Sequence, residues 1–268
     1  MKRAAMIGML VLLSGAFAYC GWRYYSETYL PNKQITEADT QQRELFVSLK
    51  PPPERFTRPA GKSAPTDDNS PEEESSPEIT DPLAELKAAN PDVAGWLTID
   101  GTNIDYPIVQ AADNGYYLQR GFDKKANYGL GCPFLDYRCE SGFGGFNSIV
   151  YAHHIKGNQA MFGDIARYKD SGFMRKNPSG TLLTADGAHN VRFFAYMTIP
   201  STAFAYETDF ADDTAREEYI NDIFNNANYT IEITPEDLKE NSGLRLLLLS
   251  TCTYEYWEAR GVLVGVIE

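Results

Sequence analysis

The chain has 268 residues, of which 43% are hydrophobic and 13% aromatic, so it can bury a sizeable core and still carry additional segments. Its 24 basic and 37 acidic residues give a formal charge of −13 at pH 7. Proteins that bind nucleic acid present basic stripes, so this charge argues against a nucleic-acid partner.

The N-terminus predicts a membrane anchor. Met1-Lys2-Arg3 precedes an uncharged stretch from Ala4 to Trp22, which as a helix would be about 28 Å long, against a hydrocarbon core of about 30 Å. The basic residues favour a cytoplasmic N-terminus. We therefore expect residues 1–30 to form a single-pass transmembrane signal anchor at the cell membrane, with the rest of the chain extracellular. Cleavage after Ala16-Phe17-Ala18, as in a signal peptide, stays an open alternative.

Residues 31–80 are rich in Pro, Ser, Thr and acidic residues. They include Pro51-Pro52-Pro53 and Glu72-Glu73-Glu74. Such a composition cannot bury enough apolar surface to offset the entropy of ordering. The sequence predicts a disordered, extended linker here.

Residues 81–268 read as a mostly β domain with a few helices. The strands, rich in β-branched or aromatic residues and separated by turn signals, are expected at 95–99, 104–109, 134–137, 148–152, 180–184, 191–199, 229–233, 244–250 and 261–267. Helices are expected after Asp81, near 159–168, and from about 215 to 225 behind a Thr214 to Glu217 capping box. Closing so many strands removes free edges, which favours a barrel.

Three residue types in this domain suggest nucleophilic chemistry. Cys252 lies at the end of the predicted strand 244–250, Arg260 opens the next strand, and His153 follows strand 148–152. Cysteine attacks as the thiolate, which a nearby imidazolium or cation stabilises, so the three together could perform acyl transfer. The alternative is that Cys252 is a small core residue.

The chain has three histidines. His189 is expected in a solvated hairpin turn. His153 and His154 are adjacent, so only one of them can face the thiol. A metal site built on this pair is the rival use, but no further His, Cys or acid stands at ligand spacing. No metal and no cofactor are therefore expected.

The chain resembles the class B sortases, a family of cysteine transpeptidases of Gram-positive bacteria. A Thr-Cys step after an apolar strand, with an Arg on the next strand, is the signature of that family. The other segments that carry the resemblance, in the order of the family, are Asn90 to Leu97, Gly101 to Gln110, Asp113 to Leu118, Phe134 to Arg138, Ile149 to His154, Met161 to Asp164 and Leu249 to Thr253. Several motifs in one order are more specific than any single motif.

The resemblance implies a closed eight-stranded β-barrel with peripheral helices. It implies that Cys252 is the nucleophile, that His153 rather than His154 is the acid, and that Arg260 stabilises the oxyanion. Family substrate contacts fall on Asn114, Leu118, Ser250 and Thr251. The partners would be secreted proteins that carry a C-terminal sorting signal, cleaved at a Thr, and an amine acceptor in a cell-wall peptide or a pilin.

Three alternatives in function stay open. They are a pilus-polymerising sortase, a different extracellular cysteine hydrolase or amidase, and a non-enzymatic surface barrel. Cys132 and Cys139 are unexpected in the family; they could form a disulfide, but the strand between them separates them. Glu255 is a candidate for an acid that assists His153. Ala152 stands where the family has Gly.

Overall fold

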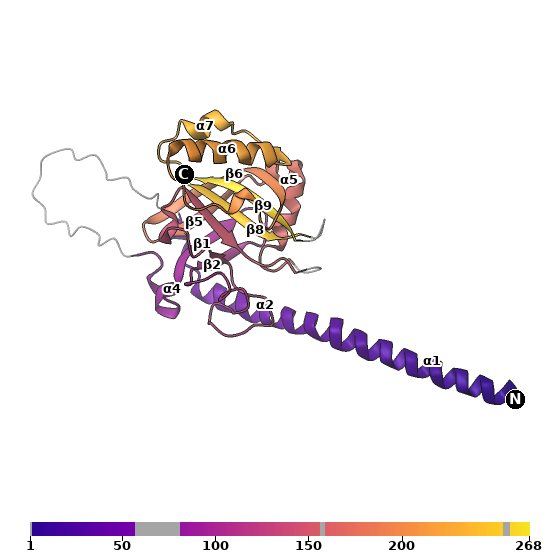
Figure 1. Cartoon of the computed structure of the whole chain (residues 1–268). Helices are drawn as coiled ribbons and strands as arrows, with labels where there is room; N and C mark the ends of the chain where they lie inside the picture. The colour runs from indigo at the N-terminus through magenta and orange to yellow at the C-terminus, as the bar shows by residue number, and fades with distance from the viewer. Residues whose placement is uncertain (1, 57–80, 156–158, 254–257) are drawn as a thin grey trace, which may run out of the picture.

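The computed structural model describes residues 2–56, 81–155, 159–253 and 258–268. These residues form a helical N-terminal segment and a β-barrel surrounded by short helices (Figure 1). Helix α1 spans Lys2–Tyr24, the π-helical turn η1 spans Tyr25–Tyr29, α2 spans Leu30–Leu49 and α3 spans Pro53–Phe56. In Figure 1, α1 extends away from the barrel, whereas α2 reaches it.

The predicted membrane anchor is not supported. A membrane-spanning helix must be long and predominantly apolar, and none of the helices in the described part of the chain satisfies both conditions. Helix α1 includes Ser14, Gly15 and Gly21, which offer little apolar surface, and Arg23 in its last turn. This finding contradicts the transmembrane signal anchor in residues 1–30, the single-pass cell-membrane location and the extracellular placement that followed from it.

The prediction of a disordered linker is wrong for its first part. Helix α2 occupies residues 30–49, and Phe46 is buried against the rings of Trp96, Tyr106 and Phe122, with ring centroids 5.9 to 6.2 Å apart. The residues of α2 that pack against the barrel recur every three or four positions: Ile35, Ala38, Gln42, Leu45, Phe46 and Leu49. This helical stripe is hidden by the polar composition of the whole segment. Residues 57–80 lie outside the described residues.

The described residues contain nine strands, which form one sheet. They are β1 Val93–Ile99, β2 Asp105–Val109, β3 Phe134–Leu135, β4 Asn147–Tyr151, β5 Ser179–Thr184, β6 Gly187–Pro200, β7 Tyr229–Thr230, β8 Leu246–Cys252 and β9 Ala259–Ile267. Their order is β5-β1-β2-β3-β4-β8-β9-β6-β7, and β5 also pairs with β6. That pairing closes eight strands into a barrel and leaves the two-residue β7 on the outside of β6. The predicted eight-stranded barrel is confirmed, and each predicted strand overlaps an observed one.

Strand β8 lies at the centre of the barrel wall that carries the candidate site. It pairs in parallel with β4 and antiparallel with β9. Leu246 to Leu249 are fully buried, as expected for a strand that reads as a continuous apolar run. Because β8 pairs along most of its length with both β4 and β9, backbone hydrogen bonds fix the position of its last residues.

The helices surround the barrel and differ in detail from the predictions. The α-helices are α4 Ala84–Ala89, α5 Ser171–Lys176, α6 Asp213–Asn226 and α7 Pro235–Lys239, and the 3-10 helices are η2 Ser141–Phe143, η3 Gly163–Lys169 and η4 Phe204–Tyr206. The helix expected at 159–168 is the 3-10 helix η3. Helix α6 is capped by Asp212, whose side chain accepts from the backbone of Ala215, in place of the predicted capping box at Thr214.

His189 is not in a solvated turn. It lies on β6 and is 5% exposed. Its Nε2 lies 3.1 Å from the Thr184 hydroxyl, and its Nδ1 lies 3.1 Å from a guanidinium nitrogen of Arg245. Because a guanidinium can only donate, Nδ1 accepts in this contact. The turn residues lie nearby, but the long strand β6 carries His189 into the barrel wall.

Candidate active site

Cys252 and Arg260 face each other across two neighbouring strands. Cys252 is the last residue of β8, and its register partner on β9 is Arg260. Both side chains are partly exposed. The antiparallel register therefore places a cation beside the thiol, as the sequence predicted from consecutive strands. Glu255, the candidate acid, lies outside the described residues.

His153 reaches the same place from the other side of β8. Strand β4 runs parallel to β8, with Tyr151 opposite Ser250, and the Thr251 hydroxyl donates to the carbonyl of Ala152 at 2.8 Å. His153 follows Ala152 just as Cys252 follows Thr251. Two parallel strands that end together thus bring the imidazole to the end of β8 that carries the thiol.

Within the part of the chain that the structure describes, one hydrogen bond orients the His153 ring. Its Nε2 lies 2.7 Å from the backbone carbonyl of Leu118. A carbonyl can only accept, so Nε2 carries the proton in this bond. Nδ1 is then the ring nitrogen left for exchange of a proton with a reacting group. His154 is used differently: its Nδ1 bonds the backbone carbonyl of Cys252 at 3.1 Å.

A cavity of about 370 Å³, here called the Cys252 cavity, joins these residues. It is lined by Asn114, Leu118, Phe134, Arg138, Tyr151, Ala152, His153, Ser201, Tyr206, Ser250, Thr251, Cys252 and Arg260. The structure therefore brings together all seven residues that the sequence predicted for catalysis and substrate contact. Their individual roles stay predictions.

Ser250 and Thr251 contribute mainly to the construction of the wall. They are 1% and 2% exposed. The Ser250 hydroxyl lies 2.9 Å from the hydroxyl of Tyr206. The Thr251 hydroxyl donates to the Ala152 carbonyl, as described above. These bonds fix the two residues that precede the thiol, which favours a rigid end of β8.

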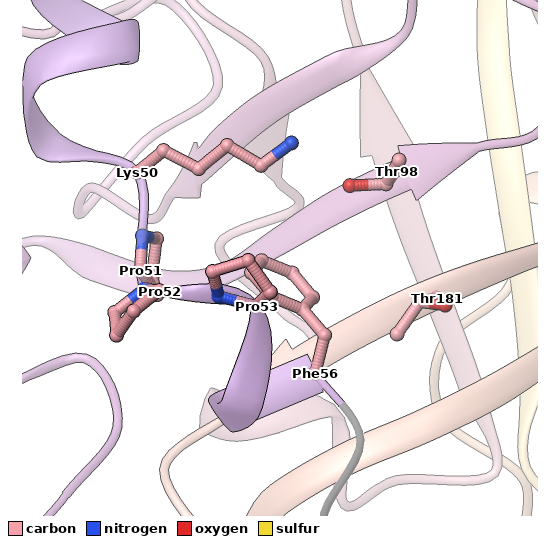
Figure 2. Close-up of a pocket in the computed structure, with 7 residues that line it drawn as sticks. All are labelled: Lys50, Pro51, Pro52, Pro53, Phe56, Thr98 and Thr181. Carbon is pink, nitrogen blue, oxygen red and sulfur yellow. The ribbon is translucent and has the colours of Figure 1, made fainter.

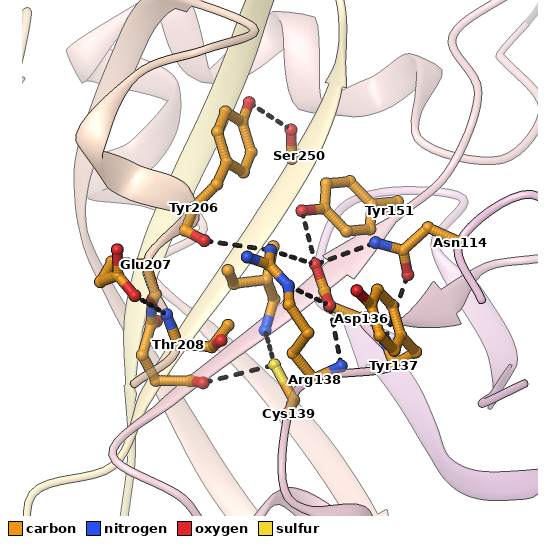
Figure 3. A network of polar contacts seen from close by, with 12 residues as sticks. Asn114, Asp136, Tyr137, Arg138, Cys139, Tyr151, Tyr206, Glu207, Thr208 and Ser250 are labelled. Atoms are coloured by element: carbon orange, nitrogen blue, oxygen red, sulfur yellow. Dashed lines mark hydrogen bonds and ion pairs between the residues drawn. The ribbon is translucent and has the colours of Figure 1, made fainter. Parts of the chain in front are cut away.

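A buried carboxylate organises the opposite wall (Figure 3). Asp136 is 0% exposed and accepts hydrogen bonds from Asn114, Tyr151 and Arg138, with the Arg138 pair at 2.7 Å. Arg138 also donates to the backbone carbonyl of Tyr206 at 3.1 Å. One carboxylate therefore holds three residues that line the Cys252 cavity.

The charge of Asp136 is stabilised by these partners. Burial by itself would raise the pKa of the Asp136 carboxyl, but the hydrogen bonds from Arg138 and Asn114 outweigh burial, and the pKa is lowered. Burial, with the nearby Asp136 charge, raises the pKa of Tyr151, so its hydroxyl stays protonated and donates. The sequence analysis noted the Phe134 to Arg138 segment only as family-like. An Asp directly after a buried strand, with an Arg two residues on, was the available signal.

The other cysteines differ from Cys252. All four cysteines are free, and Cys132 and Cys139 are buried, so these two form no disulfide. Burial raises the pKa of the Cys139 thiol to about 11 and that of Cys132 further. Neither thiol would ionise readily at neutral pH. Cys20 is exposed on α1, outside the barrel.

A larger cavity of about 580 Å³ lies elsewhere, between the end of α2 and the barrel (Figure 2). It is lined by Lys50, Pro51, Pro52, Pro53, Phe56, Thr98 and Thr181. Its cation, Lys50, is paired with Asp105 at 2.6 Å. Its described lining residues include no thiol, imidazole or carboxylate, whereas the smaller Cys252 cavity has a thiol and an imidazole. Among the described residues, no three or more His, Cys, Asp or Glu side chains are grouped to hold a metal ion.

Comparison with known proteins agrees with this geometry. No model of a protein family matches the chain. A curated relative, sortase B of Listeria monocytogenes, is 30% identical over 99% of this chain and 98% of its own length. Among solved structures, a Staphylococcus aureus sortase B-substrate complex is 26% identical with a TM-score of 0.61, and the match covers 70% of this chain and 84% of that one. A Streptococcus pyogenes class B sortase involved in pilus biogenesis is 28% identical with a TM-score of 0.60, covering 69% and 97%.

The fold and the site define a β-barrel protein with a thiol, an imidazole and a guanidinium around one cavity. With the full-length similarity to the Listeria relative, the chain belongs to the class B sortases. The relatives indicate a cysteine transpeptidase. The resemblance noted in the sequence is confirmed.

Proposed function

We propose that this protein cleaves a C-terminal sorting signal after a Thr and transfers the acyl group of that Thr to an amine. The observation that carries the proposal is the convergence of Cys252, Arg260 and His153 on the Cys252 cavity from strands β8, β9 and β4. The staphylococcal neighbour solved with its substrate supports a peptide as the occupant of this cavity.

The first half-reaction would form a thioester. The Cys252 thiolate attacks the carbonyl carbon of the Thr, and the carbon–nitrogen bond to the next residue breaks. Protonated His153 gives its proton to the departing amine nitrogen. Because Nε2 is bonded to the Leu118 carbonyl, we assign Nδ1 as the nitrogen that delivers this proton.

Arg260 would stabilise the negative charge that develops on the carbonyl oxygen. Its guanidinium lines the cavity and carries several donors, and one bond of it is seen among the described residues, from Nη1 to the Ala259 carbonyl at 3.2 Å. A preorganised donor to an oxyanion is worth about 2.7 to 4 kcal/mol of transition-state stabilisation. The remaining donors of Arg260 suit this task.

The second half-reaction would release the enzyme. An amine of the acceptor attacks the thioester carbonyl, the carbon–sulfur bond breaks, and His153 takes up the proton lost by the amine. Attack by water in place of the amine would give hydrolysis. We propose a cell-wall peptide as the acceptor. The streptococcal neighbour involved in pilus biogenesis favours a pilin amine as the second candidate.

A direct test is to incubate the full chain with a library of Thr-containing peptides and to search by mass spectrometry for an acyl adduct on Cys252. We expect an adduct on Cys252 that disappears when an acceptor amine is added. Separate incubations with a wall-type peptide amine and a lysine-containing pilin peptide would identify the acceptor. Absence of any adduct across the library would overturn the proposal and favour a non-enzymatic barrel.

A further inference from the structure

The orientation of His153 depends on a loop that belongs to neither β4 nor β8. The Leu118 carbonyl that accepts from His153 Nε2 lies in the segment between β2 and β3. Strand pairing does not fix this segment, apart from an isolated bridge between Arg120 and Ala126. The carbonyl of the preceding residue, Tyr117, accepts from the backbone N–H of Cys132 at 3.1 Å, so the residues next to Gly131 help to hold the Leu118 carbonyl in place.

Gly131 is the residue packed against this carbonyl. Its φ is +69°, in the left-handed region that favours glycine. A Cβ at this position would lie 2.9 Å from the Tyr117 carbonyl oxygen, 3.0 Å from that of Leu118 and 3.2 Å from Cδ2 of His153. A side chain at position 131 would therefore collide with the Leu118 carbonyl and the His153 ring, so the Gly131 backbone lies close to both.

Two amide side chains hold Gly131. Asn127 bonds both backbone groups of Gly131: its Nδ2 donates to the carbonyl at 2.9 Å, and its Oδ1 accepts from the N–H at 2.9 Å. Gln42 of α2 adds a second donor, from Nε2 to the Gly131 carbonyl at 3.3 Å, and its Oε1 accepts from Asn127 at 3.0 Å. The bonds form a relay from α2 through Asn127 and Gly131 to the surroundings of His153.

Gln42 is itself held firmly. It is 7% exposed, and Phe46, one turn further along α2, is buried in the aromatic cluster described above. Arg43 donates to the hydroxyl of Tyr106 at 2.7 Å. A buried amide costs free energy unless it is bonded, and an apolar residue would have sealed this helix against the barrel without that requirement. The polar choice at position 42 is explained by its bonds to the loop.

We infer that Gln42 is a positioning residue for His153, and that helix α2 sets the tautomer and orientation of this imidazole through Asn127, Gly131 and the Leu118 carbonyl. The inference rests on the proposed function for the effect on catalysis. The geometric part, the state of the His153 ring, is independent of it.

The test compares Gln42→Met, close in size but unable to make the two bonds, with Phe46→Leu as a control on the same helix that leaves the relay intact. For the full chain in the Cys252→Ala background, nitrogen-15 NMR of the histidine rings reports the tautomer of neutral His153, with its signals assigned from their loss in His153→Gln. We expect Nε2 protonated in the parent and in Phe46→Leu, and a mixture of tautomers in Gln42→Met.

The kinetic arm uses proteins that retain Cys252. Gln42→Met is expected to slow acyl-adduct formation by about tenfold, since small displacements of a catalytic group are costly, with the apparent KM of the peptide unchanged. Asn127→Leu, close in size but unable to bond Gly131, interrupts the same relay from the loop. It is expected to change both the spectrum and the rate, and it serves as the test if Gln42→Met does not fold.

An unchanged His153 spectrum in folded Gln42→Met, or in Asn127→Leu if Gln42→Met does not fold, would overturn the inference, as would a loss of rate that Phe46→Leu shares. A changed spectrum with an unchanged rate would also overturn the catalytic part. If the parent forms no adduct at all, the proposed function fails, while the ring spectra still decide whether Gln42 positions His153.

Discussion

The two sides of the Cys252 cavity are built in different ways. On one side, Cys252 and Arg260 are placed by the backbone register of β8 and β9, in which each residue has its partner on the next strand. On the other side, His153, Asn114 and Leu118 depend on side-chain hydrogen bonds to Asp136 and to the loop that includes Gly131. Cys252 is therefore held by the barrel, and His153 and the wall around Asp136 are held by polar networks.

Because of this difference, a substitution can disturb the geometry of the cavity without opening the barrel. A strand register moves only if the barrel opens, because a shift by one residue would turn every side chain to the other face. A network of side-chain bonds can lose one member while the barrel stays closed. Substitutions on the register side should therefore affect chemistry through the removed group alone, whereas substitutions on the network side should affect neighbours as well.

The largest effect is expected for Cys252→Ala. Removal of the thiol should abolish the acyl adduct, and because the side chain is partly exposed at the end of β8, thermal unfolding should be nearly unchanged. Mass spectrometry of the adduct and a thermal melt measure the two quantities. Cys139→Ala is the matched control, since its thiol is buried with a pKa raised to about 11, and it should retain the adduct. Adduct formation by the Cys252 variant would break the assignment.

The second largest effect on activity is expected for Arg260→Ala. Loss of the oxyanion donor is expected to lower kcat by about 100-fold to 1,000-fold while the barrel stays folded. Steady-state kinetics with the best library peptide provide the measurement. Arg192→Ala is the control: this residue is on β6 and pairs with Glu268 outside the cavity, so activity should be retained. Equal kinetics of the two variants would show that Arg260 has no role in the transition state.

Asp136→Asn tests the network side. It should lower the free energy of unfolding by about 2 kcal/mol, because the hydrogen bonds of a buried charged group are lost, and it should also raise the KM of the peptide. Chemical denaturation and kinetics check the two effects. Asp186→Asn is the control, because the pKa of Asp186 is also lowered but its side chain lies outside the cavity lining. A change in stability with no change in KM would limit Asp136 to a structural role.

The same carboxylate predicts a pH dependence. Because the pKa of Asp136 is lowered in the folded protein, its contribution to stability is fully present above the carboxyl's unfolded pKa, about 4, and is lost as the pH falls through the folded-state value. The stability difference between the parent and Asp136→Asn should therefore be largest at neutral pH and shrink below about pH 4. Denaturation curves at a series of pH values measure it, and a constant difference would contradict the argument.

The smallest effect is expected for Leu118→Ala. The Leu118 side chain is 39% exposed, so stability should change by less than about 0.5 kcal/mol. The backbone carbonyl that bonds His153 is retained, so kcat should be preserved, and only KM should rise if the side chain contacts the peptide. A fall in kcat with unchanged KM would show that the side chain, and not only the carbonyl, positions His153.

The sequence by itself determined the barrel and which residues meet at the candidate site. The nine strands follow from alternating or continuous apolar runs with turn residues between them, and Cys252, His153 and Arg260 stand at strand ends that short connections and parallel pairing bring together. Local patterns suffice here because strand pairing is dictated by backbone hydrogen bonds and by burial of one face.

The tertiary structure alone decided the rest. Helix α2 looked like part of a polar linker, and Asp136 had no role of its own within the predicted strand 134–137. Each is stabilised by partners far away in the chain: Gln42 by Gly131, and Asp136 by Asn114 and Tyr151. Composition also predicted a membrane anchor that the described helices do not support. A buried polar side chain carries no local signature, since its free energy depends on which donors the fold delivers to it.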